Sequence, residues 1–530
     1  MANDHAPFHP IIYVRGYAMT EREQDETTAD PFCGFNLGST VYRATPDKDK
    51  PARKFVFESP LVRLMSDTIA RRDGSEVGYL DVYENGLDIL DDEWTGTIRY
   101  QSIVIYRYYD QASSLLGNGK TPEMEDFAKG LGRLILRIRE LACQDPRNNV
   151  TPEDFRCYLV AHSMGGLVCR AFLQNPELGD DEARRCVDKV FTYATPHNGI
   201  EMAGLNIPKW LNAADMNNFN RQRMAGYLNL APVYSKTERV DWLPDTAFPA
   251  ERFFCMVGTN RADYDVALGL SRSFAGHGSD GLVKVENASL WGVNAKGQFT
   301  TPCATAYTYR SHSGNFGIVN SEEAYQNLTR FLFGDIRVDI WLDVDAVQLP
   351  PDLQGKPVNA LYQFEVLASP RGKRWYLTRR VAEEDSVACR SHTELTDPAN
   401  KLARKLYLST VFLANSGKVN PDRKSLAYSM TLGVRVPDYE VERKFWADTH
   451  YEGSYLFRDS VVIEMIPAET PGDAWSINFA WQSDTVGRAT TPIAYKMLKT
   501  GKLEIPIPFG NNAAPGIQGK LRFIASAWNG

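Results

Sequence analysis

Residues 158–167 read YLVAHSMGGL, and this stretch decides the fold. The apolar run Cys157–Ala161 predicts a buried strand, and an apolar pattern with helical spacing follows the stretch. Ser163 falls on the turn between them, as in a nucleophile elbow. The serine backbone in such a turn is strained, so the residues two before and two after it must be small. Ala161 and Gly165 occupy these positions, which gives an A-x-S-x-G pattern where glycine is usual at the first position. We therefore expect a nucleophile here rather than an idle serine in a glycine-rich turn.

Apolar runs before and after this stretch predict the other strands of one sheet. A helix with an apolar face separates two of the runs; it is expected to begin with Thr121 as its N-cap and to stop at Asp145. A last helix ends at Gly334. Strands that alternate with helices indicate an α/β fold, with a mostly parallel sheet covered by helices on both faces. The runs are residues 10–14, 102–110, 189–194, 253–258 and 306–309.

The length and composition of the chain limit its class. A length of 530 residues predicts two or three domains, and a formal net charge of −7 is too mild to indicate a nucleic-acid partner. No apolar run is long enough to span a membrane. The first residues carry no basic segment followed by an apolar one, which favours the cytoplasm, with a removed leader or a non-classical export route as the alternatives.

The cysteines predict neither a disulfide framework nor a zinc site. There are eight, at positions 33, 143, 157, 169, 186, 255, 303 and 389, and none form a C-x-x-C pair. Several fall in expected core strands or helices. We expect buried free thiols, as in a reducing compartment.

Two backbone N–H groups are candidates for an oxyanion hole. The run at residues 10–14 opens into a loop at Arg15-Gly16-Tyr17, and the loop after an early strand supplies one such donor in hydrolases with an elbow serine. Tyr17 is the candidate in that loop, and Met164, next to the serine, is the second.

Residues 200–250 interrupt the alternation of strands and helices. They carry apolar residues amid polar residues and breaks. This pattern fits a cap or lid over an apolar pocket, and it fits a peripheral helical insertion equally well.

The composition changes near residue 336. Helical spacing gives way to alternation, with Val338, Ile340 and Leu342 on one face, and turns rich in Pro, Gly and Asn follow. We expect a catalytic domain over residues 1–335 and an all-β sandwich over 336–530. The sandwich either braces the first domain or docks to lipid, polymer or protein, and its sequence does not separate these roles.

A nucleophilic serine needs a base, and one histidine is placed to be it. The eight histidines are His5, His9, His162, His197, His277, His312, His392 and His450. Two precede the elbow, two lie in the β domain, and His162 is adjacent to the serine and cannot fold back onto it. His312 alone follows a late strand just before the last helix, where a loop can bring its ring over the elbow. His197 and His277 are expected to be structural.

The acid that orients the base has three candidates. Asp280 lies in Ser279-Asp280-Gly281-Leu282-Val283, a turn that enters an extended segment. Asp263 and Asp265 lie closer to the end of the strand at 253–258, where the acid also commonly falls. Motif context favours Asp280, and the alternative stays open.

Three motifs together resemble the lipase-type α/β-hydrolases, including bacterial lipases with alanine in the elbow. They are AHSMGG at 161–166, YATPHNG at 193–199 and SDGLV at 279–283. The resemblance covers roughly residues 10–334 and implies Ser163 as nucleophile, Asp280 as acid and His312 as base. It also implies ester hydrolysis through an acyl-enzyme, no cofactor, and often a lid. The family often has His-Gly at the oxyanion loop, where this chain has Arg15-Gly16. Some of these lipases bind calcium or zinc, but no ligand set here compels either.

These observations predict a serine carboxylic-ester hydrolase, a lipase or esterase with phospholipase activity included. Its partner is an ester or lipid substrate, and contact with a membrane surface is compatible with that. The alternatives are an acyltransferase or thioesterase with the same three residues, and an inert hydrolase-like binding protein. Acyl chain length and oligomeric state are not readable from the sequence.

Overall fold

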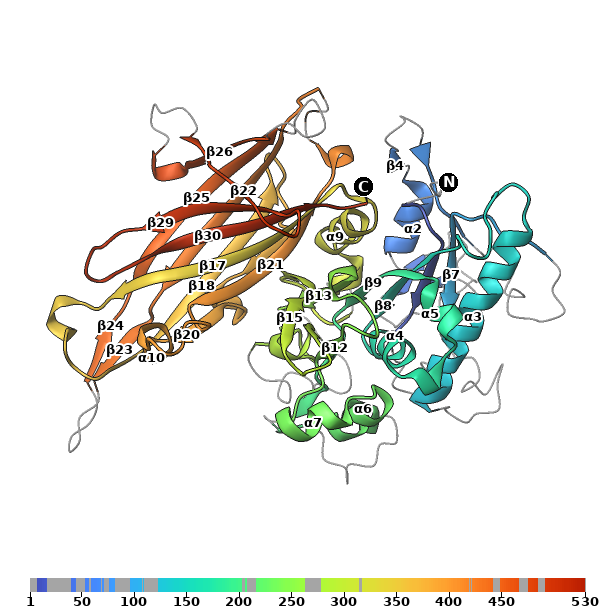
Figure 1. Cartoon of the computed structure of the whole chain (residues 1–530), viewed down its shortest axis with the longest axis horizontal. Coiled ribbons are helices and arrows are strands. Elements are labelled where there is room, and N and C mark those ends of the chain that lie inside the picture. The colour runs from blue at the N-terminus through green and yellow to red at the C-terminus, as the bar shows by residue number, and fades with distance from the viewer. Residues whose placement is uncertain are drawn as a thin grey trace. The chain divides into compact units, whose positions relative to one another are not determined.

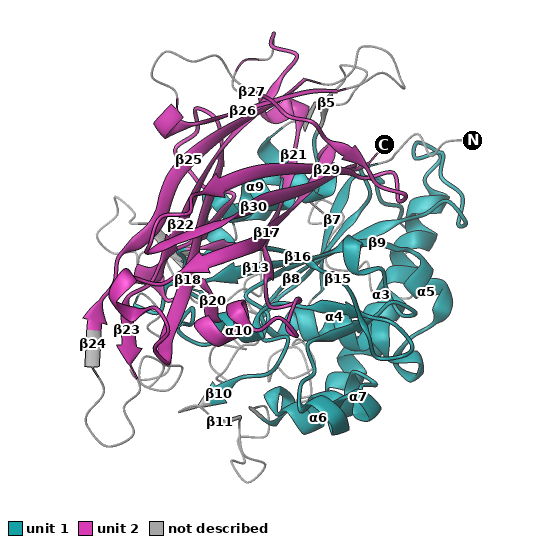
Figure 2. Ribbon diagram, turned by 60° about the vertical axis from the view of Figure 1, so that its left-hand side comes forward, with its two compact units in different colours: residues 1–305, 309–332 teal, residues 306–308, 333–530 magenta. Residues whose placement is uncertain are grey.

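The computed structural model divides into two compact units (Figure 2). Unit 1 comprises Met1–Thr305 and Tyr309–Leu332, and unit 2 comprises Ala306–Thr308 and Phe333–Gly530. The expected domain boundary at 335/336 falls within unit 2. The residues that the structure describes are 7–16, 40–43, 53–56, 59–67, 69–70, 76–81, 96–106, 108, 123–202, 205–206, 216–262, 278–313, 317–418, 420, 422–441, 449–466, 475–484 and 491–529.

Unit 1 contains the expected parallel sheet (Figure 1). The described strands follow the order β16-β13-β9-β8-β1-β7-β6, and the pairings from β13 through to β6 are parallel. The elbow strand β8 therefore lies in the interior of the sheet, between β9 and β1. The strands are β1 (Ile11–Val14), β6 (Leu80–Asp81), β7 (Ser102–Tyr106), β8 (Cys157–His162), β9 (Val187–Tyr193), β13 (Phe253–Gly258) and β16 (Ala304–Thr308).

Helices cover both faces of this sheet. The core on one face joins strand residues such as Val190 to α3 (Met124–Gln144) and α4 (Met164–Gln174). Successive strand residues point to opposite faces. Phe191 accordingly packs on the other side, where its ring centroid lies 5.9 Å from that of Phe331 in α9 (Glu322–Phe333). The predicted α/β arrangement is confirmed.

The start of α3 differs from the prediction. Its N-cap residue is Glu123, not Thr121, and the backbone N–H of Glu123 donates to Asp126 at 3.3 Å. Acidic side chains in this first turn are favourable because the N-terminal end of a helix is the positive end of its dipole. Thr121 lies outside the described residues.

Smaller elements of unit 1 surround the sheet. The segment 200–250 is described in part and holds two short helices, α6 (Arg221–Tyr227) and α7 (Ala231–Thr237). The others are α2 (Ser59–Ser66), α5 (Asp181–Arg185), β2 (Thr40–Arg43), β3 (Arg53–Val56), β4 (Ile69–Ala70), β5 (Glu76–Val77), β10 (Glu201–Met202), β11 (Leu205–Asn206), β12 (Trp242–Pro244), β14 (Trp291–Val293) and β15 (Phe299–Pro302).

Unit 2 is a sandwich of two antiparallel sheets, as the alternation predicted. Its core joins Leu342 of one sheet to Phe364 and Leu432 of the other. The first sheet has the order β21 (Lys405–Leu413), β17 (Ile336–Gln348), β30 (Gly516–Ala527), β29 (Leu503–Gly510) and β28 (Lys496–Met497). The second has β24 (Thr449–Glu452), β23 (Asp438–Val441), β18 (Val358–Pro370), β22 (Leu426–Arg435), β25 (Tyr455–Ile466), β26 (Ser476–Trp481) and β27 (Thr491–Pro492), with β19 (Thr378–Arg380) and β20 (Ala388–Ser391) also paired to β18. A short helix, α10 (His392–Thr396), follows β20.

Candidate active site

Ser163 lies on a strained turn between β8 and α4. Its φ of 51° and ψ of −122° fall in a backbone region that residues other than glycine rarely adopt. Hydrogen bonds on both sides hold it there: its N–H donates to the carbonyl of Tyr193 at 2.8 Å, and its own carbonyl accepts from the Thr195 hydroxyl at 2.9 Å. The last residue of β9 and the loop after it thus fix the serine backbone in its strained conformation.

Gly165 must lack a side chain for this turn to form. A Cβ there would lie 2.3 Å from the carbonyl oxygen of Val14 and 2.5 Å from that of Arg15. Both are backbone atoms, which cannot move aside as a flexible side chain can. The small residue expected after the serine is therefore required by the close approach of β1 to α4.

The structure brings Ser163, His312 and Asp280 into one hydrogen-bonded chain. His312 Nε2 lies 2.9 Å from Ser163 Oγ, and His312 Nδ1 lies 2.9 Å from Asp280 Oδ2. An ionised carboxylate only accepts hydrogen bonds, so Nδ1 carries the ring proton and Nε2 of a neutral ring accepts from the serine hydroxyl. All three side chains are buried. The chain has the order of groups that nucleophilic serine chemistry requires.

Asp280 is itself held by its own turn. Its Oδ1 accepts from the N–H groups of Leu282 and Val283 at 3.0 and 2.7 Å, while Oδ2 stays free for His312. The backbone adds a further link, since the His312 N–H donates to the Asp280 carbonyl at 2.9 Å. The Ser-Asp-Gly-Leu-Val motif therefore builds the turn that aims the carboxylate.

The other candidates are either outside the described residues or engaged elsewhere. Asp263, Asp265, His277 and Tyr17 lie outside them. His197 is buried, and its Nε2 lies 3.1 Å from the Thr192 hydroxyl, in a structural hydrogen bond as expected. Burial and the nearby Arg170 guanidinium hold its pKa well below the usual value, so the ring is neutral.

His162 is a residue of this site that the sequence did not reveal. Its Nε2 lies 3.0 Å from the carbonyl oxygen of His312, and the two rings are 5.2 Å apart. A carbonyl only accepts, so Nε2 carries the proton and donates. Burial, with a smaller contribution from His312, lowers the pKa of His162 to about 3, so it stays neutral. The His162 side chain cannot reach Ser163, but it contacts His312, the residue that bonds to Ser163.

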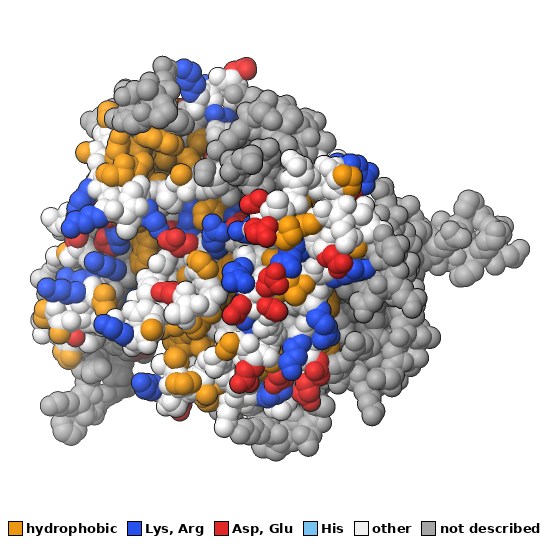
Figure 3. All heavy atoms as spheres, turned by 45° about the vertical axis from the view of Figure 1, so that its right-hand side comes forward, with side chains coloured by type: hydrophobic (Ala, Val, Ile, Leu, Met, Phe, Trp, Pro, Cys, Tyr) orange, Lys and Arg blue, Asp and Glu red, His pale blue; other side chains and the backbone are white. Residues whose placement is uncertain are grey.

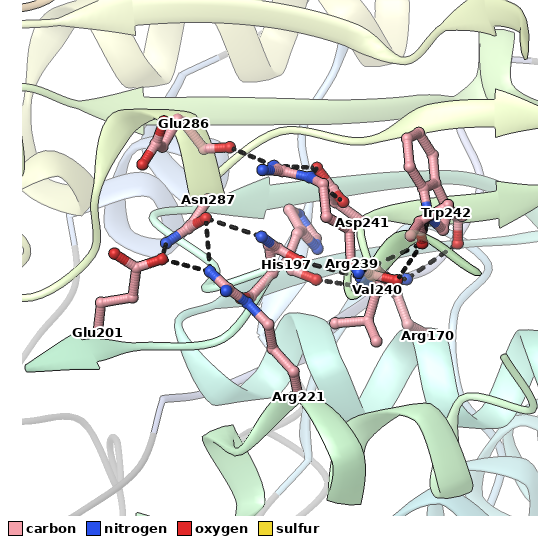
Figure 4. Close-up of polar contacts among 12 residues, drawn as sticks. Arg170, His197, Glu201, Arg221, Arg239, Val240, Asp241, Trp242, Glu286 and Asn287 are labelled. Atoms are coloured by element: carbon pink, nitrogen blue, oxygen red, sulfur yellow. Dashed lines mark hydrogen bonds and ion pairs between the residues drawn. The ribbon is translucent and has the colours of Figure 1, made fainter. Parts of the chain in front are cut away.

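A buried polar network supports the loop after β9 (Figure 4). Arg170 of α4 is fully buried, and its guanidinium donates to the carbonyl oxygens of His197, Val240 and Trp242 at 2.7 to 3.0 Å. Burial lowers the pKa of Arg170 to about 10. These bonds tie the helix that follows Ser163 to the segment containing His197.

A second part of this network reaches the turn that carries Asp280. Asn198 bonds Asn287 twice, through its side-chain amide and its N–H, both at 2.9 Å. Glu201 lies beside them and forms an ion pair with Arg221 (Figure 4). It forms a second ion pair with Lys284. Burial opposes ionisation of Glu201, but the hydrogen bonds from Lys284, Arg221 and Asn287 outweigh it, and the pKa of Glu201 is lowered. His197-Asn198-Gly199, from the YATPHNG motif, therefore joins the loop after β9 to the segment that follows Asp280.

Among the described residues, no three His, Cys, Asp or Glu side chains gather so that they could hold a metal ion. Nor does any helix of the described chain have the length and apolar character needed to cross a membrane.

A family model matches part of unit 1, and the solved structures that resemble the chain align with larger shares of it. Residues 111–230 match the PGAP1-like alpha/beta domain. No curated relative matches the chain. The mature lipase BlEst2 of Bacillus licheniformis is 15% identical, with 62% of this chain and 93% of that chain covered and a TM-score of 0.31. Phospholipase PlaB of Legionella pneumophila is 13% identical, with 84% and 90% covered and a TM-score of 0.31. Its complex with thio-NAD is 14% identical, with 91% of each chain covered and a TM-score of 0.29.

The domain match, the parallel sheet and the strained serine turn all fall in the same unit. Residues 111–230 include β8, the elbow and α4, the elements that carry Ser163. Unit 1 therefore has an α/β-hydrolase fold, and its residues 111–230 match the PGAP1-like alpha/beta domain.

Proposed function

We propose that this protein is a serine carboxylic-ester hydrolase that cleaves lipid esters through an acyl-enzyme on Ser163. The observation that carries the proposal is the hydrogen-bonded chain from Ser163 through His312 to Asp280 on a strained elbow. These three residues are suited to removing the serine proton. His312, the base, lies within hydrogen-bond distance of Ser163, and its other nitrogen is held by the Asp280 carboxylate.

Acylation would proceed in two proton transfers. His312 Nε2 takes the hydroxyl proton of Ser163 as Oγ forms a bond to the ester carbonyl carbon. Asp280 stabilises the imidazolium that results. The imidazolium then gives this proton to the departing alkoxide as the ester C–O bond breaks. The alcohol leaves, and the acyl group stays on Ser163.

Deacylation would repeat these transfers with water. His312 takes a proton from a water molecule as its oxygen attacks the acyl carbon, then returns the proton to Ser163 Oγ as that bond breaks. The N–H of Met164, at the start of α4, and the N–H of Tyr17 are the proposed donors to the oxyanion. Met164 is well suited because the N-terminal end of a helix favours negative charge.

The test is the Ser163→Ala variant, assayed on p-nitrophenyl esters of increasing acyl length. Loss of turnover with an unchanged unfolding temperature supports the proposal; retained turnover overturns it. Asp280→Ala and Asp263→Ala should be compared in the same assay, since loss of turnover only in the second would assign the acid to Asp263.

Product analysis with an added alcohol separates a hydrolase, which releases free acid, from an acyltransferase, which forms a new ester. Thioester substrates, run alongside, test for a thioesterase.

A further inference from the structure

Unit 2 contains a cavity of about 370 Å³, and none of the candidate active-site residues lines it. It forms where β18 and β21 end and β22 begins. Arg371 follows β18, while Lys418 and Arg423 belong to the loop that joins β21 to β22. The N–H of Arg371 donates to the carbonyl of Ala427 at 2.9 Å, which ties the first loop to the strand after the second.

The lining of this cavity is basic. Arg371, Lys418 and Arg423 line it, and no Asp or Glu is among the described residues that do. Within the described chain none of the three forms an ion pair; the Lys418 ammonium donates to the backbone carbonyls of Arg423 and Lys424, at 3.0 and 3.3 Å. Over the face shown in Figure 3, basic and acidic side chains intermingle. The cavity thus concentrates one sign of charge on a chain whose net charge is −7.

The surrounding loops strengthen this bias. The first continues as Arg371-Gly372-Lys373-Arg374, and the second adds Lys424, against a single acid, Asp422. Like charges held close together repel one another, and a bound anion relieves that repulsion. Structural arginines are normally paired with carboxylates, as Arg522 is with Asp343 in the same unit. Among the described residues, no carboxylate pairs with Arg371, Lys418 or Arg423 in this way.

The geometry points to a phosphate group as the ligand. We propose that this cavity binds a phosphate carried either by a small organic phosphate or by a phospholipid headgroup. Guanidinium groups match phosphate oxygens in paired hydrogen bonds, and Lys418 adds a third positive charge. The volume is at the lower end of the range of about 300 to 1,000 Å³ for small-molecule sites. Leu426 and Tyr428 also line the cavity, so it has apolar surface for the carbon skeleton that bears the phosphate.

The experiment uses the full chain with Ser163→Ala, so that lipid is not consumed. Binding to inorganic pyrophosphate is measured by calorimetry, and binding to phosphatidylcholine vesicles, with and without phosphatidylglycerol, by co-sedimentation. The test variant is Arg371→Gln with Arg423→Gln, both exposed residues. The control is Lys356→Gln with Lys405→Gln, which removes the same charge. These two exposed lysines lie just before β18 and at the start of β21, the far ends of the strands that lead to the cavity.

We expect the test variant to weaken binding by about tenfold or more and the control by less than about twofold. Pyrophosphate binding would identify a soluble phosphate as the ligand. Binding only to vesicles that contain phosphatidylglycerol would identify a lipid headgroup. If neither probe binds, the proposal is wrong. It is also wrong if both double variants lose affinity equally, because binding would then depend on overall charge and not on the cavity. These outcomes are independent of ester hydrolysis.

Discussion

His162 donates a hydrogen bond from Nε2 to the backbone carbonyl of His312, at 3.0 Å. Both residues are next to the proposed nucleophile. His162 precedes Ser163 in the sequence, and the ring of His312 contacts Ser163 Oγ. The loop that carries His312 is therefore fastened to the strand that carries the serine. His162 is a positioning residue in this arrangement, since its hydrogen bond reaches His312 at the backbone carbonyl.

The first prediction concerns this contact. His162→Ala should lower kcat for p-nitrophenyl esters by about tenfold or more with little change in KM, because small misplacements of a base are costly. His162→Gln keeps an N–H donor and should recover most of kcat. A purely structural role would predict equal losses of folded protein and of kcat, with no recovery by glutamine.

The second prediction is the effect of pH on stability. The pKa of His162 is about 3 when folded, against 6.5 for a free histidine. Between these values the unfolded chain binds a proton that the folded chain does not, so stability falls as pH falls. At about pH 5 this one group should cost the folded state about 2 kcal/mol relative to about pH 7.5. Urea unfolding should show that wild type loses this much more than His162→Gln over the same interval; equal losses would contradict the assignment.

The third prediction concerns the close approach at the elbow. Gly165→Ala places a Cβ 2.3 Å from the Val14 carbonyl oxygen, so it should displace β1 or the serine turn and destabilise by about 2 kcal/mol or more. Gly226→Ala is the matched control, because nothing lies within 4 Å of its added Cβ and it is exposed on α6. It should stabilise by up to about 1 kcal/mol, as helix propensity requires. Similar unfolding temperatures for the two variants would be evidence against the packing described for Gly165.

The fourth prediction concerns Arg170. Arg170→Met keeps much of the side-chain volume but leaves the carbonyls of His197, Val240 and Trp242 without their donor. The free energy of unfolding should fall by about 3 kcal/mol or more. Arg185→Met, on the exposed side of α5, should change it by less than about 0.5 kcal/mol. Equal effects in urea titrations would argue against the bracing role of the network.

The fold was predictable where local pattern and burial agree. The strand at 253–258 was expected with the bounds that β13 has, because a fully buried parallel strand is a continuous apolar run. β29 (Leu503–Gly510) went unpredicted, because Pro506 and Pro508 cannot donate to a ladder. Among the described strands, β28 pairs with Leu503 and Glu504 at the start of β29, and the rest of β29 pairs with β30 on one side. The prolines therefore lie on an edge, where the missing N–H is tolerated.

The site was predictable only in part, because most of its residues come together from distant parts of the sequence. Ser163 has a local signature, the strained turn. Asp280 and His312 come from distant loops, so chain order could propose them without excluding Asp263 or Asp265. From the sequence, His162 is excluded as the base because it cannot fold back onto Ser163. Its actual partner is a backbone carbonyl 150 positions along the chain, which no sequence pattern encodes.

The role of Ser163 is tested most directly by labelling with a fluorophosphonate, followed by peptide mass spectrometry. Such probes react with serines that an adjacent base activates. We predict one adduct, on Ser163, in the wild-type protein and none in folded Ser163→Ala or His312→Ala. An adduct elsewhere, or none on folded wild type, would contradict the proposal and would indicate an inert hydrolase fold.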